Sequence, residues 1–413
     1  AINGMVNAGN ATVGGGNFTF DNSTGAMTSA GKSATVLQMI SPVYSIDISS
    51  LGGIKANSIS MVGNNLGFGV RNKGSITANS TLSITNNGLL TNDGSIASNG
   101  YLTSIAASGN FTNNGTLTTK NMTMITTYGA LNNGSKGTIS STKQLVLNAS
   151  GNIQNSGTIS ATSSLVAASN GAITNNAGAK ITSDAQITAT SLGNFTNDGT
   201  IKGKNTALNF IGTNFKNTGT ISATGKVAVK SLKQDSTTNT GEIYNLGTIS
   251  GENIDMQTNG TLAQSTSGRM EATNAITAHS YWLNNNGYMK AADITTDHGT
   301  ISNTGTITAA NVSLTTYYDV TNEGTIYSTG DLLLDTQLKG NIYNYSLIQA
   351  NGTLTMTAKK VVNSGRGCGW LKFNTCDVGT ISANKMVLNS SYKYASEMGG
   401  YQYFKIAEIN TVL

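Results

Sequence analysis

The stretch NTGTITAANVSLTTYYDVTNEGTI, residues 303–326, decides the fold because it contains one whole repeat and the start of the next. Its signature is Asn-x-Gly-Thr-Ile, which occupies residues 303–307 and again residues 322–326. Close variants of this signature recur along the chain, and their glycines are mostly 18 to 22 residues apart. Self-similarity at such a period indicates a solenoid or another repeat array.

Within one repeat, the apolar residues have the spacing of β-strands. After Gly305 come Ile307, Ala309, Val312 and Leu314, in pairs two residues apart with polar residues between the pairs. A period of two indicates strands, and the many Gly and Asn residues disfavour helices. The sequence therefore predicts an all-β fold, a right-handed parallel β-helix with three short strands per coil and about 20 residues per coil.

The asparagines of the signature are expected to lie at one corner of the coils. Identical amides that recur once per coil can stack as a hydrogen-bonded ladder along the axis. We also expect the glycine after Asn-x to supply the positive φ of a sharp corner. The predicted ladder consists of Asn72, Asn92, Asn113, Asn155, Asn197, Asn217, Asn303 and Asn322.

A second segment, LGGIKANSISMVGNNLGFGVRN at residues 51–72, resembles the end of the secretion domain of two-partner-secretion exoproteins, the filamentous haemagglutinin-like family. The units that follow are similar to the haemagglutinin repeats of that family. This resemblance divides the chain into the end of a secretion-type β-helical domain (1–73), a haemagglutinin-repeat stalk (74–390) and a C-terminal cap or start of the next region (391–413).

The resemblance implies a secreted, surface-displayed fibrous adhesin or stalk segment of a diderm bacterium, acting as a rigid spacer and contact surface. Its implied partners are an outer-membrane transporter for secretion and a host or neighbouring-cell receptor or glycan. The stalk of a contact-dependent growth-inhibition effector is the alternative within the same resemblance. Because no signal peptide, Asn-Pro-x-Gly secretion motif or toxin domain is recognisable, we expect an internal fragment of a longer exoprotein.

Composition weighs against several other classes of protein. The net charge is +5, only 10% of residues are charged, and no basic run is interleaved with aromatic residues, so nucleic-acid binding is not expected. The 49 glycines interrupt every long apolar run, so we expect no membrane-spanning segment. We also expect no cofactor.

The two cysteines, Cys368 and Cys376, lie close together in the sequence. A zinc site needs more ligands than the two histidines supply, so no metal site is expected. A disulfide that closes a small loop is the better interpretation and fits an oxidising, exported setting. A second interpretation is that Trp370 on this loop forms a contact surface.

A carbohydrate-active β-helix enzyme is the alternative from another class, and it requires acidic residues that meet on adjacent coils. Aligning the coils on their inward apolar residues places Asp293 in an outward column with Asn311, and Asp297 in a column with His279. No two carboxylates meet, Asp331 and Asp335 are separated along one strand, and both histidines are expected on outward faces. We therefore predict no catalytic residue.

Two irregularities in the repeat are the candidate contact regions. The step from Gly219 to Gly247 is 28 residues, so about eight residues must leave the coil as a loop, which is either an inert insertion or a recognition loop. After residue 385 the repeat fades into aromatic residues that either cap the last coil or begin a receptor-binding region. The possible contact residues are Lys233, Asp235, Trp370, Tyr392 and Tyr401.

Overall fold

The structure, a computed structural model, describes residues 2–15, 18–20, 27–29, 44–64, 69–232, 241–363, 379–390, 403–406 and 409–410 of the chain. It divides into two units, Ala1–Lys204 and Asn205–Leu413. The described residues form a parallel β-solenoid with roughly 21 residues per coil and contain no helix. This confirms the predicted all-β parallel β-helix.

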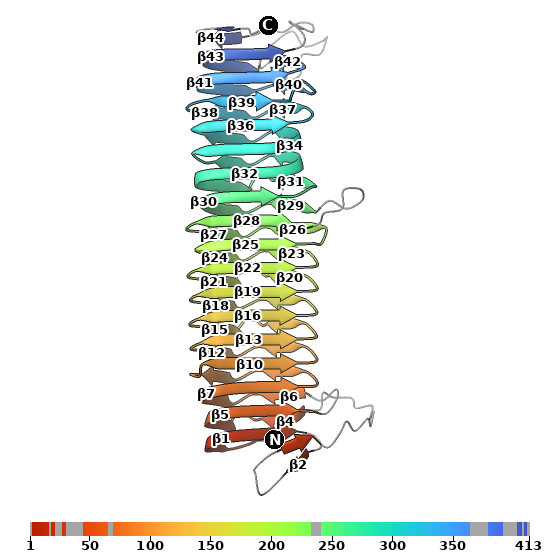
Figure 1. Cartoon of the computed structure of the whole chain (residues 1–413), viewed down its shortest axis with the longest axis vertical. Coiled ribbons are helices and arrows are strands. Elements are labelled where there is room, and N and C mark those ends of the chain that lie inside the picture. Colours follow the sequence, from red (N-terminus) through yellow and green to blue (C-terminus); the bar gives the residue numbers. More distant parts are fainter. Residues whose placement is uncertain are drawn as a thin grey trace. The chain divides into compact units, whose positions relative to one another are not determined.

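A typical coil of the first unit has three strands. The first strand is β9 (Ser95–Ser98), the second is β10 (Leu102–Ala107) and the third is β11 (Phe111–Asn113). Each strand pairs in parallel with the strand of the same kind in the next coil, so that β10 pairs with β13 (Met122–Thr127). Figure 1 shows the second strands β10, β13, β16, β19 and β22 following one another as parallel arrows.

The first unit contains strands β1 to β24. At its beginning, β5 and β7 each join a first and a second strand, β1 pairs with β5, and β2 and β3 form a separate antiparallel pair. The remaining bounds are β1 (Met5–Gly15), β2 (Phe18–Phe20), β3 (Met27–Ser29), β4 (Tyr44–Ile48), β5 (Gly53–Gly63), β6 (Gly69–Asn72), β7 (Ser75–Asn86), β8 (Leu90–Asn92), β12 (Thr116–Thr119), β14 (Leu131–Asn133), β15 (Thr138–Ser141), β16 (Gln144–Ala149), β17 (Ile153–Asn155), β18 (Thr158–Ala161), β19 (Ser164–Ser169), β20 (Ile173–Asn175), β21 (Lys180–Ser183), β22 (Gln186–Ser191), β23 (Phe195–Asn197) and β24 (Thr200–Gly203).

The second unit repeats this coil with more fused strands. A regular coil consists of β35 (Thr306–Ala309), β36 (Asn311–Thr316) and β37 (Val320–Asn322). In contrast, β32 (Arg269–Asn285) runs through all three strand positions, and β34 (Asp293–Asn303) joins a second and a third strand. These long strands arise where the corners between strand positions are short.

The other strands of the second unit complete the same pattern. Their bounds are β25 (Asn205–Phe210), β26 (Asn214–Asn217), β27 (Thr220–Ala223), β28 (Lys226–Ser231), β29 (Glu242–Asn245), β30 (Thr248–Gln257), β31 (Thr261–Gln264), β33 (Tyr288–Lys290), β38 (Thr325–Ser328), β39 (Leu332–Asp335), β40 (Asn341–Asn344), β41 (Leu347–Ala358), β42 (Lys360–Asn363), β43 (Thr380–Ser390), β44 (Tyr403–Ile406) and β45 (Ile409–Asn410).

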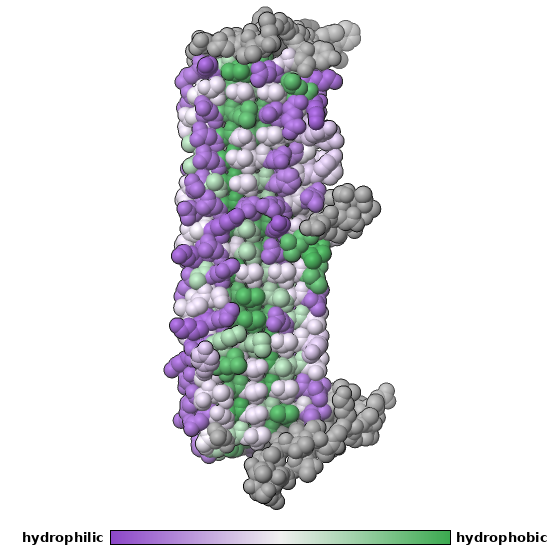
Figure 2. Space-filling model, in the orientation of Figure 1, coloured by the Kyte–Doolittle hydropathy of each residue, from purple (hydrophilic) through white to green (hydrophobic). Residues whose placement is uncertain are grey.

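The core of each unit is built from apolar residues that face inward at every second position. In the first unit, Ile139, Ile159 and Ile181 are paired in register on successive first strands and are buried. In the second unit, Ile221 and Ile249 are paired in the same way. Each such side chain contributes about 1.5 to 3 kcal/mol, and it is buried only because a neighbouring coil covers it. On the outside, Figure 2 shows hydrophilic and apolar residues side by side on the visible face.

A buried column of side-chain amides runs along the corner that follows the third strands. Asn113 donates from Nδ2 to Asn133 Oδ1 (2.8 Å) and to the carbonyl of Thr138 (3.2 Å), while its Oδ1 accepts from Asn92 (2.7 Å). Each amide therefore ties its coil to the next through both side chain and backbone. In the first unit the column consists of Asn72, Asn92, Asn113, Asn133, Asn155, Asn175 and Asn197. In the second unit it consists of Asn217, Asn245, Gln264, Asn285, Asn303, Asn322, Asn344 and Asn363.

The glycines of the signature have a different role from the predicted one. Among the described residues Gly178 is the only glycine with a positive φ (78°), so the expectation of positive φ holds at the glycine of Asn176-Ala177-Gly178 and is wrong at the other signature glycines. A Cβ on Gly94 would lie 2.2 Å from the carbonyl oxygen of Gly74, and one on Gly115 would lie 1.9 Å from that of Gly94. Glycine is favoured at Gly94 and Gly115 because a side chain there would require the backbone of the neighbouring coil to shift.

Candidate functional site

Several residues of the predicted sites lie in segments that the structure does not describe. Cys368, Cys376, Lys233, Asp235, Trp370, Tyr392 and Tyr401 all lie outside the described residues. The disulfide and the two contact regions therefore stay predictions, as do the domain boundaries at residues 73 and 390.

All eight asparagines of the predicted ladder lie in the two buried amide columns. Sequence reasoning missed seven further members: Asn133, Asn175, Asn245, Gln264, Asn285, Asn344 and Asn363. Three of them were hidden because two extra residues separate the amide from the position of the signature glycine, as between Asn133 and Gly137. A search that allowed this longer corner, and Gln in place of Asn, would have found them.

The outward face of the second strands in the second unit carries the acidic residues considered for catalysis. The register pairs Asp293 with Asn311 and Asp297 with His279, as the alignment of coils predicted. The imidazole Nδ1 of His279 lies 3.6 Å from Asp297 Oδ2, and both side chains are more than half exposed. Such a pair contributes little to stability.

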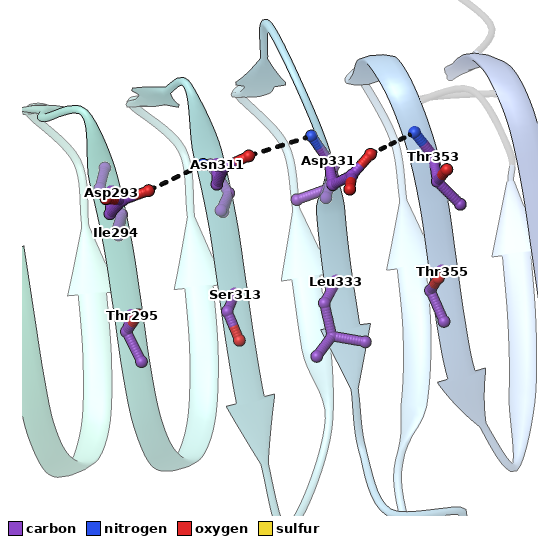
Figure 3. A pocket seen from close by; sticks show the side chains of 11 residues that line it. Asp293, Ile294, Thr295, Asn311, Ser313, Asp331, Leu333, Thr353 and Thr355 are labelled. Carbon is purple, nitrogen blue, oxygen red and sulfur yellow. Dashed lines mark hydrogen bonds between the residues drawn. The ribbon is translucent and has the colours of Figure 1, made fainter.

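A shallow groove of about 500 Å³ crosses this face at the start of β34, β36 and β39 and in the second half of β41. One edge is a hydrogen-bonded row (Figure 3), in which Asn311 Nδ2 donates to Asp293 Oδ1 (2.9 Å) and the Thr353 N–H donates to Asp331 Oδ1 (2.7 Å). The N–H of Asp331 in turn donates to Asn311 Oδ1 (3.4 Å). The carboxylates of Asp293 and Asp331 are separated by one coil, and each accepts a hydrogen bond from the coil that follows it. The two carboxylates therefore form part of a polar edge and do not meet as a pair.

His298 does not face outward, so that expectation is wrong. It lies at the inner end of the second-strand part of β34, between Ser280 and Thr316 of the neighbouring coils, and is only 4% exposed. Its Nδ1 lies 2.7 Å from Ser280 Oγ, and its Nε2 is buried without a hydrogen-bond partner. Burial lowers the pKa of His298 to about 3, so the imidazole is neutral near pH 7.

The most distinctive surface feature is a cluster of four aromatic residues at the corner between the second and third strands. The aromatic cluster consists of Tyr281, Trp282, Tyr317 and Tyr318, each between 42% and 46% exposed. The ring centroids of Tyr281 and Trp282 are 4.4 Å apart, those of Tyr317 and Tyr318 are 5.0 Å apart, and 6.3 Å separates Tyr281 from Tyr318. The four rings thus form one continuous surface across three coils.

The next corner, from Thr336 to Asn341, brings a cation to the aromatic cluster. Lys339 Nζ lies 3.9 Å from the ring centroid of Tyr317. The same corner holds Gln337 and Leu338 at φ values of 54° and 60°, which the side chain of leucine disfavours by about 1 to 2 kcal/mol. The N–H of Gln337 donates to Asp335 Oδ1 (2.7 Å), which helps to hold this conformation.

Sequence reasoning missed the aromatic cluster although its signal is present. The doublets Tyr281-Trp282 and Tyr317-Tyr318 are 36 residues apart, which is two coils of 18 residues. The sequence analysis considered the aromatic residues after residue 385, where the repeat fades, and not those that recur within regular coils.

Comparison with known families gives one match. The family model described as haemagglutinin repeat matches residues 69–115 and 116–199. Residues 69–199 are thus similar to haemagglutinin repeats. This finding confirms the resemblance to the filamentous haemagglutinin-like family. Searches of curated proteins and of solved structures give no significant match.

Haemagglutinin repeats on a β-solenoid fit a filamentous adhesin-like stalk. The haemagglutinin-repeat family is a family of non-enzymatic adhesins that are secreted or surface-exposed, and it implies a two-partner secretion context. Within the described part of the chain, no helix is both long and apolar enough to cross a membrane. Nor do the described residues gather three or more His, Cys, Asp or Glu side chains that could hold a metal ion. The aromatic cluster lies outside the matched haemagglutinin repeats.

Proposed function

We propose that this chain is a stalk segment of a secreted fibrous adhesin, displayed on the surface of a diderm bacterium, where it acts as a rigid spacer and contact surface. The proposal includes secretion through an outer-membrane transporter partner, and the family's two-partner context supports it. The same spacer would serve a contact-dependent growth-inhibition effector, in which a toxin domain is carried beyond it.

The observation that carries this proposal is the buried amide column in each unit. In the second unit, Asn303 donates to Asn322 Oδ1 (2.8 Å) and to the carbonyl of Thr325 (3.2 Å), so neighbouring coils are joined inside as well as along the strand edges. Bending or sliding one coil against the next would break buried hydrogen bonds, and each one lost leaves a polar group unpaired at a cost of about 1 to 3 kcal/mol. A column of this kind resists deformation.

Single-molecule force measurements on the whole chain test the spacer role. We expect the chain to remain folded under load and then to unfold in steps of one or a few coils, as expected of a stack in which each coil contacts only its neighbours. Asn303→Asp should lower the unfolding force of the second unit, whereas the exposed Asn99→Asp should not change that of the first. Extension at very low force, without steps, would refute the spacer role.

Surface display requires a separate experiment in the source organism. An epitope tag placed in the chain should be accessible to antibody on intact cells, and deletion of the transporter gene should abolish the labelling. Labelling only after the cells are opened, in the presence of the transporter, would refute the proposed display.

A further inference from the structure

The aromatic cluster depends on an unusual alternation along one corner. Successive coils there carry Gly260, Tyr281, Gly299, Tyr318 and Gly340. The N–H of Tyr281 donates to the carbonyl of Gly260 (2.9 Å), and that of Tyr318 donates to Gly299 (2.8 Å), so the residues follow one another from coil to coil. The cluster is therefore built into the solenoid rather than placed on a loop.

Gly299 creates the room in which the rings of two separate coils meet. A Cβ at this position would lie 2.6 Å from the carbonyl oxygen of Tyr281 and 3.4 Å from Cδ2 of its ring. Without a side chain on the intervening coil, the rings of Tyr281 and Tyr318 come within contact distance of each other. A hydrogen bond with the Tyr281 side chain also raises the pKa of Tyr318.

Polar side chains border the aromatic cluster. His279 and Asp297 lie two residues before Tyr281 and Gly299 on the outward face, and Asp335 lies just before the Lys339 corner. Three carboxylates belong to this part of the surface, those of Asp297, Asp319 and Asp335, against two ammonium groups, those of Lys339, which lies over Tyr317, and of Lys359, which follows Gly340 on the next coil. The border therefore offers hydrogen-bond donors and acceptors while disfavouring an anionic ligand.

We propose that the aromatic cluster is a binding site for a neutral glycan, whose sugar rings lie against Tyr281, Trp282 and Tyr318 while their hydroxyls reach Asp297 and His279. The inference deepens the contact-surface part of the proposed function and rests on it. Aromatic rings that are half exposed and held by the backbone lose little entropy on binding. Four rings on one corner cover far less than the roughly 800 Å² per partner of a stable interface, which disfavours a second copy of the chain as the occupant. The carboxylates disfavour sulfated or uronic glycans.

Tryptophan fluorescence can test the proposal, because the chain contains two tryptophans. In the full chain carrying Trp370→Phe, Trp282 is the only reporter. We expect at least one neutral tetrasaccharide of glucose, galactose, mannose or N-acetylhexosamine to change its emission in a saturable way. A heparin-derived tetrasaccharide should bind more weakly than the best neutral ligand.

Variants then assign the binding to the aromatic cluster. The double variant Tyr281→Ala/Tyr318→Ala should weaken binding by about tenfold or more, whereas Tyr318→Phe, which keeps the ring, should stay within about twofold. Tyr128→Ala is the matched control, since Tyr128 follows the same inward position of a second strand in the first unit, is 73% exposed and adjoins Gly129. Circular dichroism should show that each variant is folded.

Three results would overturn the inference: no response to any neutral tetrasaccharide, tighter binding of the heparin fragment, or a self-association that Tyr281→Ala/Tyr318→Ala abolishes. None of these would affect the spacer proposal, which is judged by unfolding force and by surface labelling and involves neither tyrosine.

Discussion

The two units differ most at the corner between the second and third strands. In the first unit this corner carries glycine in coil after coil: Gly88, Gly109, Gly129, Gly151, Gly171 and Gly193. In the second unit glycine alternates there with tyrosine. The corner that follows the third strands, which carries the Asn-x-Gly signature, is in contrast alike in both units and encloses the amide column in both. One corner is thus fixed by the fold, and the other can carry side chains for contact.

The amide column gives the largest expected effect and tests whether the shared corner is equivalent in the two units. Asn113→Asp and Asn303→Asp each replace a donor by a carboxylate that faces the amide oxygen and the carbonyl to which the asparagine had donated. Each should lower the free energy of unfolding by about 3 kcal/mol or more at pH 7. Thermal melting and hydrogen exchange in each unit measure the effect.

Asn99→Asp is the control for this prediction, because Asn99 donates to Asn79 across exposed surface (3.4 Å) and not inside the coil. It should change stability by no more than about 0.5 kcal/mol. A mild effect at Asn303 beside a severe one at Asn113 would mean that the two units do not share the same supporting corner.

Glycine-to-alanine changes compare the two corners within the first unit. An added Cβ at Gly115 would lie 1.9 Å from a backbone oxygen, but at Gly151 the nearest atoms are 3.0 Å away. Gly115→Ala should therefore cost about 3 kcal/mol, and Gly151→Ala about 1 kcal/mol or less. Equal losses in denaturant titrations would show that both corners are equally closed to side chains.

Acid should weaken the second unit first. The inward position of His298 is occupied in the first unit by small residues such as Thr127, Ala149 and Ser169. Because burial lowers the pKa of His298 from 6.5 to about 3, the unfolded chain binds the proton more readily than the folded one. Stability is thus full above pH 6.5 and falls as the pH drops from 6.5 towards 3.

Hydrogen exchange at pH 7 and pH 4.5 would detect this loss around residues 280–316. His298→Thr, which introduces the residue of the next coil, should flatten the pH dependence over this range. An unchanged slope in that variant would assign the acid sensitivity to other groups.

Much of the architecture could be predicted because one short sequence motif, Asn-x-Gly-Thr-Ile, is repeated once per coil. The period, the pairs of apolar residues two apart and the Asn column each follow from packing one coil on another. The role of the signature glycines could not be predicted in this way. It depends on the distance between the backbones of Gly94 and Gly115, which is known only once the coils are stacked. His298 was misassigned although the period of two, counted from the inward Ile294, places it inward. The aromatic cluster was missed because its contact spans three coils.

Surface ion pairs give the smallest expected effect and complete the comparison. In the first unit, Arg71 binds Asp47 through two hydrogen bonds (2.9 Å and 2.6 Å), and about a quarter of each side chain is exposed. The hydrogen bond from Arg71 lowers the pKa of Asp47, so the stabilisation by this pair is present above the usual value of 3.8 and is lost as the pH falls below it.

The pair of His279 and Asp297 in the second unit is longer and mostly exposed. Asp47→Asn should therefore cost about 1 kcal/mol at pH 7 and Asp297→Asn less than about 0.5 kcal/mol, because solvent screens the exposed pair. If melting curves showed the larger loss for Asp297→Asn, this face of the second unit would hold an electrostatic contact that the geometry of the pair does not explain.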